Sequence, residues 1–191
     1  WTSSKQMVDF FDVKGDVEAL LARTAQSAHY SFVAAEHAAL HPGQSASILR
    51  DGEAMGWLGA LHPKIQRQLG LSQPIYLFQL DLAGLMHVAL PAYRDISKFP
   101  EVRRDLAFFV EPAVSAAAVL SAARSAAGGD LIDVALFDVY RDDKSQDQLK
   151  SLAVSLTFQR TDRTLTDEEV NDAVEKTLAA LVSACGAKLR G

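Results

Sequence analysis

The chain has 191 residues, of which 49% are hydrophobic and 23% charged, and its formal net charge is −5 at pH 7. These values are typical of a globular protein of one or two domains, and no apolar run approaches the roughly 20 residues that a membrane-spanning helix needs. Because non-specific nucleic-acid binding requires a basic surface, an acidic chain limits any RNA contact to a local, structured site.

The single cysteine and the first residue of the chain are also informative. Cys185 is the single cysteine, which excludes an intramolecular disulfide and favours a reducing compartment. The chain begins at Trp1 without a methionine and carries no signal-peptide pattern, so we expect it to be a piece of a longer polypeptide.

The first half of the chain predicts a mixture of strands and short helices. The stretch DFFDVKGDVEALLARTA indicates a short strand, a turn at Lys14–Gly15 and a helix with Asp16 as its N-cap. Asp51–Gly52 separates two apolar runs, which is the signal of a two-residue hairpin. HPKIQRQLGL is typical of a short helix closed by Gly70, and IYLFQLDL of a further strand. The proline and polar residues within 91–98 form the best candidate for a linker.

After Pro100 the pattern of elements becomes regular. RRDLAFFV, LIDVALFDVY and LKSLAVSLTFQ are predicted strands, and AVSAAAVLSAARSAAGG is a predicted alanine-rich helix closed by two glycines. The last helix begins at a capping box of Thr166 and Glu169 and ends at Gly186, after which AKLR supplies a short final strand. The order β-α-β-β-α-β is that of a ferredoxin-like domain, with two helices covering one face of a four-stranded antiparallel sheet.

Side-chain alternation predicts the two faces of this sheet. The third strand turns large apolar residues to one face, which we assign to the core: Leu152, Val154, Leu156 and Phe158. Strict alternation in the second strand groups Ile132, Val134, Leu136, Asp138 and Tyr140 on one face, and Asp133, Ala135, Phe137 and Val139 on the other. In the first strand, Leu106 and Phe108 face the helices. Phe109 and Phe137 then lie on or near the uncovered face, where they either stack on RNA bases or pack against a partner domain.

Five motifs in the second half carry a family resemblance. FPEVRRDLAFFV, LFDVYR, KSLAVSLTFQ, RTLTDEEV and AKLR together resemble the ferredoxin-fold anticodon-binding domain that ends the β subunit of bacterial phenylalanyl–tRNA synthetase. Upstream, VDFFDVKGDVEALL, LHPGQSASI, GWLGALHPKI and YLFQLDL resemble the end of the catalytic-like module of the same subunit. The resemblance implies an α+β chain with two domains: an antiparallel, class II synthetase-like segment over residues 1–93 and the ferredoxin-like anticodon-binding domain over residues 98–191.

The resemblance also implies a function and partners. The whole enzyme would join phenylalanine to its tRNA, using ATP and magnesium, as a cytoplasmic heterotetramer of two α and two β chains. This chain would bind the anticodon region of tRNA(Phe) and pack against the catalytic α subunit, with no catalytic residue, metal or cofactor of its own and no membrane partner. Class II synthetase chemistry needs arginines that bind ATP. The first half of the chain shows no recognisable ATP-binding arginine motif around Arg23, Arg50 or Arg67. Editing activity is expected outside this part of the subunit.

Candidate RNA-binding residues lie at the ends of the predicted strands and in the adjoining loops. They are Arg103, Arg104, Asp105, Phe137, Asp138, Tyr140, Arg141, Lys150, Ser151 and Arg190, with Lys144 and Arg160 as further candidates. Arginine suits phosphates and base edges through its planar fork, and a carboxylate can orient an arginine or accept a hydrogen bond from a base. An alternative for Arg104 is a structural ion pair with Asp105 or Asp138.

Other features have competing interpretations. His37 and His41, with Glu36 beside them, have a spacing that can hold zinc on a helix, but Pro42 ends any helix there and we expect no metal site. The glycines of GWLG are compatible with a backbone clamp on nucleic acid or with close packing of strands. For the ferredoxin-like domain, the alternative to RNA binding is a protein-interaction module, which the acidic net charge favours.

Overall fold

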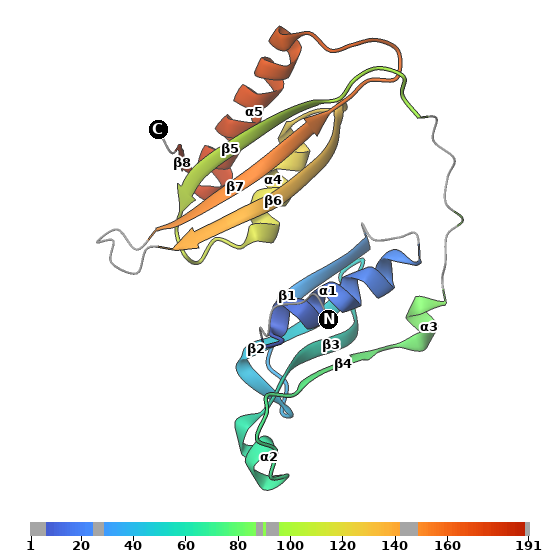
Figure 1. Cartoon of the computed structure of the whole chain (residues 1–191), viewed down its shortest axis with the longest axis vertical. Helices are drawn as coiled ribbons and strands as arrows, with labels where there is room; N and C mark the ends of the chain where they lie inside the picture. The colour runs from blue at the N-terminus through green and yellow to red at the C-terminus, as the bar shows by residue number, and fades with distance from the viewer. Residues whose placement is uncertain (1–6, 25–28, 87–89, 91–95, 142–148, 190–191) are drawn as a thin grey trace. The chain divides into compact units, whose positions relative to one another are not determined.

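The computed structural model of the protein describes residues 7–24, 29–86, 90, 96–141 and 149–189 (Figure 1). The chain divides into two compact units, unit 1 (Trp1–Tyr93) and unit 2 (Arg94–Gly191). The elements of unit 1 are, in chain order, α1 (Phe10–Ala22), β1 (Tyr30–Ala34), β2 (Leu40–Arg50), β3 (Glu53–Leu61), α2 (Pro63–Gln68), β4 (Tyr76–Leu80) and α3 (Leu82–Leu85). Those of unit 2 are β5 (Val102–Val110), α4 (Ala116–Ala126), β6 (Leu131–Arg141), β7 (Lys150–Phe158), α5 (Asp167–Cys185) and β8 (Lys188–Leu189).

Unit 1 is an antiparallel sheet with a helix on one face. Its strands pair in the order β1-β2-β3-β4, and α1 lies against the sheet (Figure 1). Val17 and Leu21 of α1 are buried against Ile48 and Leu58 of the sheet. Burying an aliphatic side chain of this size contributes about 1.5–3 kcal/mol, so this apolar contact holds the helix in place.

The start of α1 differs from the sequence-based expectation. The helix begins at Phe10, and its N-cap is Asp9 rather than Asp16. The Asp9 carboxylate accepts hydrogen bonds from the backbone N–H groups of Phe11 and Asp12, while the Asp12 carboxylate accepts one from the Asp9 N–H. This reciprocal capping box satisfies donors that a strand would leave open, so the predicted strand and the turn at Lys14–Gly15 are wrong.

The predicted hairpin and short helix of unit 1 are confirmed. Asp51 and Gly52 connect β2 to β3 with φ angles of 50° and 88°. Positive φ at both central residues is the requirement of a type I′ turn, whose twist matches that of the flanking strands. After α2, Gly70 adopts a φ of 67°, a value at which a side chain would be strained.

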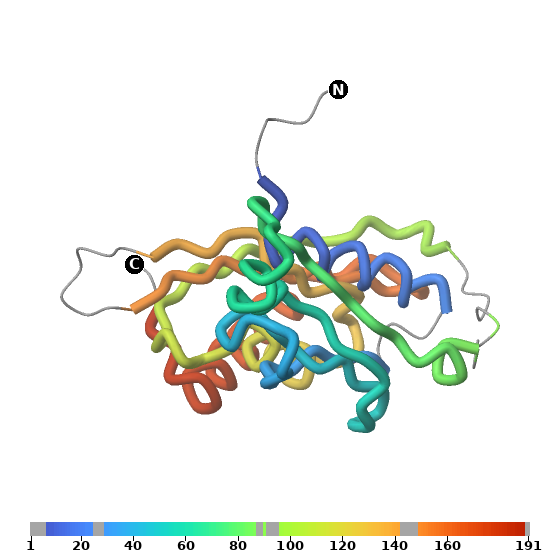
Figure 2. The backbone as a smooth tube through the Cα atoms, turned by 90° about the horizontal axis from the view of Figure 1, so that it is seen from below, coloured from blue at the N-terminus to red at the C-terminus, as the bar shows by residue number. Residues whose placement is uncertain are grey.

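Unit 2 confirms the ferredoxin-like arrangement. Its strands pair antiparallel in the order β6-β7-β5-β8, and α4 and α5 pack together against one face of the sheet (Figure 1; Figure 2). The core contains the residues of β7 that alternation assigned to it, Leu152, Val154, Leu156 and Phe158, together with Phe108 of β5. The capping box of Thr166 and Glu169 begins α5, and Gly186 ends it in the left-handed conformation.

Strand β6 departs from regular pairing with β7 near its start, between Leu131 and Asp133. Leu131 lies opposite Phe158, but the next pair joins Asp133 to Thr157, so Ile132 is an extra residue. Leu131 therefore packs against the core, and Ile132, which alternation placed there, is 52% exposed. The predicted side for Ile132 is wrong because a bulge shifts the alternation by one residue.

The length and apolar character of the helices also bear on membrane insertion. In the described part of the chain, no helix combines the length and the apolar character that crossing a bilayer requires.

Candidate nucleic-acid interface

The sheet of unit 2 has one face turned away from α4 and α5, which we call the open face. Residues that lie directly opposite one another on antiparallel strands point to the same side of the sheet. The pairing therefore assigns to the open face Arg103, Asp105, Ala107 and Phe109 of β5, Ser151, Ala153, Ser155 and Thr157 of β7, Asp133, Ala135, Asp138 and Tyr140 of β6, and Lys188 of β8.

A second bulge in β6 determines which of its side chains reach the open face. Leu136 lies opposite Val154, and the next pair joins Asp138 to Ala153, which leaves Phe137 as an extra residue. The strand alternation shifts by one position at Phe137. Beyond it, the residues that strict alternation assigned to the core face are turned to the other side.

The bulge brings two candidate residues onto the open face. Asp138 and Tyr140 had been grouped with the core-facing residues, and that assignment is wrong, whereas Val139 now takes the side of the helices. Phe137 and Tyr140 remain 53% and 56% exposed. Two aromatic side chains are thus accessible along one strand.

Arg103 and Asp105 form an ion pair on the open face. Arg103 Nε donates to Asp105 Oδ1 at 3.1 Å, and the Arg103 guanidinium carbon lies over the Phe137 ring, 5.9 Å from its centre. The neighbouring Ser155 hydroxyl and the Arg103 guanidinium lower the pKa of Asp105, so this carboxyl is ionised at neutral pH. Ser155 lies opposite Asp105 in the sheet, and among the described residues its buried hydroxyl has no hydrogen-bond partner within normal bonding geometry.

Arg104 has a different partner from those suggested by the sequence. It lies opposite Leu156, on the helix side of the sheet, and its Nη2 donates to Asp167 Oδ1 at 2.9 Å. The predicted ion pair of Arg104 with Asp105 or Asp138 is therefore wrong. Arg104 instead joins the start of β5 to the first turn of α5.

Lys150 is a structural residue. Its side chain is buried, and its ammonium donates to the carbonyl oxygens of Pro112, at 3.1 Å, and Val114. Burial lowers the pKa of Lys150, and the nearby positive charge of Arg141 adds to this effect. Its engaged ammonium leaves it poorly suited to a phosphate.

The remaining candidates divide into accessible and inaccessible positions. Arg141 is exposed at the end of β6, opposite Lys150 and so on the helix side of the sheet, whereas Ser151 faces the open side and is buried. Lys144 and Arg190 lie outside the described residues.

The loop between β7 and α5 is held by ion pairs. Arg160 donates to both carboxylate oxygens of Asp162, at 2.8 and 3.0 Å, and its Nη1 lies 3.8 Å from Asp130. Arg163 pairs with Glu169 in the same way, and this contact lowers the pKa of Glu169 to about 2. Arg160 uses both Nε and Nη2 on Asp162, whereas Arg103 uses only Nε on Asp105, so Arg160 is a weaker RNA candidate than Arg103.

The charges of the open face indicate what it can bind. The carboxylates of Asp105, Asp133 and Asp138 lie among the cations Arg103 and Lys188, so the face is not a uniformly basic, phosphate-binding surface. Exposed aromatic rings beside polar groups suit unpaired bases, which stack on rings and present donors and acceptors at their edges.

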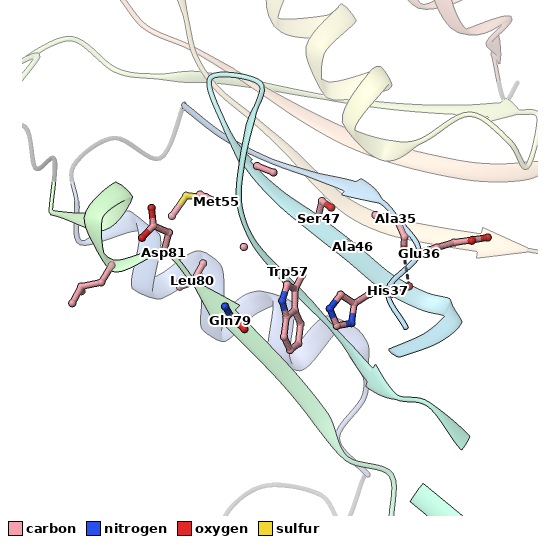
Figure 3. Close-up of a pocket in the computed structure, with 14 residues that line it drawn as sticks. Ala35, Glu36, His37, Ala46, Ser47, Met55, Trp57, Gln79, Leu80 and Asp81 are labelled. Carbon is pink, nitrogen blue, oxygen red and sulfur yellow. Dashed lines mark hydrogen bonds between the residues drawn. The ribbon is translucent and has the colours of Figure 1, made fainter. Parts of the chain in front are cut away.

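Unit 1 contains a pocket of about 580 Å³ on its sheet (Figure 3). The rings of His37 and Trp57 stack in it, with centres 4.6 Å apart and planes inclined by 26°, beside Gln79 and Asp81. Within the described ranges, no three His, Cys, Asp or Glu side chains converge in a way that could hold a metal ion. The structure shows the His37 ring in a stacking contact with Trp57.

The glycines of GWLG allow the strands of unit 1 to approach closely. A Cβ atom on Gly56 would lie 2.2 Å from the Gln79 carbonyl oxygen, and one on Gly59 would lie 2.5 Å from that of Gln44. Real Cβ atoms do not come this close to backbone oxygen. These contacts support the packing interpretation of GWLG.

The arginines of unit 1 do not fit a nucleotide with its metal. Arg50 donates to the Gly84 carbonyl oxygen at 2.6 Å, Arg67 Nε donates to that of Pro63 at 3.3 Å, and Arg23 is the C-cap of α1. They lie on separate elements.

Two family models match the chain. The model described as the ferredoxin-fold anticodon binding domain matches residues 97–190, and the model described as the phenylalanyl tRNA synthetase beta chain CLM domain matches residues 1–82. The strand order and helix cover of unit 2 agree with the first description.

Curated relatives are similar to the whole chain. The phenylalanine–tRNA ligase beta subunits of Pseudomonas syringae pv. tomato, Pseudomonas putida and Shewanella oneidensis are 47%, 46% and 42% identical to it over 190 residues. Each alignment covers 100% of this chain and 24% of the relative, so the chain spans about a quarter of their length. With both family models in the order expected, the chain belongs to the phenylalanine–tRNA ligase β-subunit family.

Proposed function

We propose that unit 2 binds the anticodon region of tRNA(Phe) through its open face. The observation that carries this proposal is the exposure of two rings on β6, Phe137 and Tyr140, with the guanidinium of Arg103 over the Phe137 ring. Anticodon bases are unpaired, and unpaired bases are the part of an RNA that proteins read by stacking and by contacts to base edges.

The open face and its rim offer the kinds of contact by which a protein binds the unpaired bases and phosphates of an anticodon loop. The rings of Phe137 and Tyr140 provide stacking surfaces, and the carboxylate of Asp138 can accept hydrogen bonds from base N–H groups. Arg141 lies opposite Lys150, on the helix side of the sheet, but it is exposed at the end of β6 and so is available to a phosphate at the rim of the open face. Lys150 is left out of the proposed contacts because its ammonium is engaged with backbone carbonyls.

The activity of the whole enzyme is a further part of the proposal. By analogy with the relatives, the complete protein ligates phenylalanine to tRNA in the cytoplasm with ATP and magnesium, as a heterotetramer in which the α subunit carries out the chemistry. Residues 1–93 then form a module that packs against the α subunit, and residues 98–191 the anticodon-binding domain.

Titrating the 191-residue chain into a fluorescein-labelled anticodon stem-loop of bacterial tRNA(Phe), followed by fluorescence anisotropy, tests RNA binding. Phe137→Ala, Tyr140→Ala and Arg141→Ala are expected to weaken binding, each ring by about 1–3 kcal/mol if it stacks on a base. Ile132→Ala, an equally exposed apolar residue at the other bulge of β6, is the control and is expected to leave binding unchanged.

Salt dependence separates RNA binding from the protein-interaction alternative. Phosphate contacts release counterions, so the logarithm of the binding constant is expected to fall linearly with the logarithm of salt concentration between about 50 and 200 mM. Absence of binding at the lowest salt would favour a domain that serves protein assembly alone.

The same chain is expected to lack the ligase chemistry. Because Arg50 and Arg67 of unit 1 donate to backbone carbonyls on separate elements, the pure protein is expected to give no phenylalanine-dependent exchange of pyrophosphate into ATP. Measurable exchange, free of contaminating α subunit by mass spectrometry, would contradict the assignment of unit 1 as non-catalytic.

A further inference from the structure

Arg103 contacts two other side chains of the open face, Asp105 and Phe137. Its guanidinium, from β5, reaches over the Phe137 ring of β6 across the intervening strand β7. Together these groups form a surface that we call the Arg103–Phe137 platform. Because 53% of the Phe137 side chain is still exposed, an unpaired base can contact the ring and the guanidinium at once.

Asp105 is placed to fix this conformation of Arg103. The two residues are separated by one position in β5, so they share a face of the strand. The Asp105 carboxylate accepts the Nε–H of Arg103 at 3.1 Å, so this bond uses Nε and not the terminal nitrogens of the guanidinium. A single anchored Nε–H restricts the rotations of a side chain that otherwise loses about 1.5–2 kcal/mol of rotamer entropy when it is ordered.

The carboxylate of Asp105 is itself held in place. It lies opposite Ser155 of β7, whose buried hydroxyl is beside it, and both this hydroxyl and Arg103 favour its ionised form. The contacts therefore run from Asp105 to Arg103 and on to Phe137, and Ser155 of the central strand lies opposite Asp105. Each of these side chains comes from a strand rather than a loop, so the arrangement is present before RNA arrives.

We propose that Asp105 is a positioning residue, which holds Arg103 over Phe137 as a preformed platform for an unpaired base. The inference rests on the proposed RNA binding of unit 2. Asp105 itself contacts Arg103 and not the RNA. Preorganisation of this kind raises affinity by removing the cost of ordering the arginine on binding.

Whether neutralising Asp105 weakens or strengthens RNA binding distinguishes a positioning role from a simple effect of its charge. A carboxylate near an RNA repels phosphates, so neutralising it by charge alone strengthens binding. A positioning carboxylate has the opposite effect, because its removal releases Arg103 from the platform. Asp133, another exposed carboxylate of the open face, lies opposite Thr157 and provides the matched control.

The test is a double-mutant cycle in the anisotropy assay, with the stem-loop of tRNA(Phe) as the probe. Asp105→Asn is expected to weaken binding about fivefold in the wild-type background, within the range of couplings between contacting residues, and to have no effect in the Arg103→Ala background. Asp133→Asn is expected to leave binding unchanged or to strengthen it slightly. Asp105→Glu, which keeps the charge, is expected to recover part of the lost affinity.

A second measurement reports the conformation of Arg103 directly. In the free protein, the NMR signal of the Arg103 Nε–H is expected to be protected from exchange and shifted by the Phe137 ring, and Asp105→Asn is expected to remove both features. Tighter binding by Asp105→Asn, or an equal loss in the Arg103→Ala background, would overturn the proposal. If the wild-type chain binds no RNA at all, the proposed function fails instead, while the NMR result still reports on the platform.

Discussion

Arg103 and Arg104 are adjacent in β5 yet serve opposite faces of the sheet. Arg103 pairs with Asp105 on the open face, and Arg104 pairs with Asp167 at the start of α5. Alternation of side chains along a strand separates two identical residues into different surroundings. One arginine is available to a ligand, whereas the other joins two elements of the domain.

The two arginines are therefore expected to respond differently to substitution. Arg104→Ala removes a largely exposed ion pair, so we expect it to lower the free energy of unfolding by about 0–1 kcal/mol and to leave RNA binding unchanged. Arg103→Ala is expected to weaken RNA binding with little change in stability. Urea unfolding and anisotropy titration of both variants check this contrast, and a large binding loss in Arg104→Ala would show that both arginines serve the RNA.

Lys150 provides a test of a buried cation. Lys150→Met keeps most of the side-chain volume but leaves the carbonyls of Pro112 and Val114 without their donor. We expect the free energy of unfolding to fall by about 1–3 kcal/mol, the cost of unsatisfied buried polar groups. Lys188→Met, at an exposed position of the open face, is the control and is expected to change stability by less than about 0.5 kcal/mol.

The pKa of Glu169 predicts a pH dependence of stability. In the folded protein this pKa is about 2, below its ordinary value of 4.5, so the ionised carboxylate stabilises the fold. The contribution is complete above about pH 4.5 and is lost as the pH falls toward 2. The melting temperatures of the wild type and Glu169→Gln are therefore expected to differ at pH 7 and to converge over this range. Glu168→Gln, outside the ion pair, is expected to give no such convergence.

Glycines of unit 1 provide a matched pair of substitutions. Gly56→Ala places a methyl group 2.2 Å from the Gln79 carbonyl, so we expect it to destabilise unit 1 by about 3 kcal/mol or more. Gly15→Ala lies inside α1, where no atom is within 4 Å of the added methyl group, and is expected to stabilise the helix by about 0.5–1 kcal/mol. Urea unfolding followed by tryptophan fluorescence measures both, and a tolerated Gly56→Ala would contradict the close strand approach.

Features with a local chemical signature could be predicted from the sequence. The Asp51–Gly52 hairpin depends on residues that tolerate positive φ, and the α5 capping box on Thr166 and Glu169 at a spacing of three. The alternation of β7 gave its core residues correctly because that strand is regular and central. These elements, in their order along the chain, were sufficient for the fold of unit 2.

Features that depend on partners distant in sequence could not be predicted. The bulge at Phe137 arises from the pairing of β6 with β7, and no residue type in LFDVYR indicates a bulge. Arg104 pairs with Asp167, which lies 63 positions away in the sequence. Lys150 donates to a backbone carbonyl, and because every residue has a carbonyl, the sequence does not indicate which one is the acceptor. At α1 the sequence does contain a local signal, because Asp9 and Asp12 form a capping box upstream of Asp16, the expected N-cap.

The bulges of β6 have a consequence beyond the side chains they present. β6 is an outer strand of its sheet, and a regular outer strand offers a row of unpaired backbone groups to which another chain can add. Its two extra residues interrupt that row and twist the strand, which opposes the aggregation of one molecule with the next. A variant that made β6 regular would therefore be expected to associate with itself, so the irregularity that exposes the aromatic rings also protects the domain's solubility.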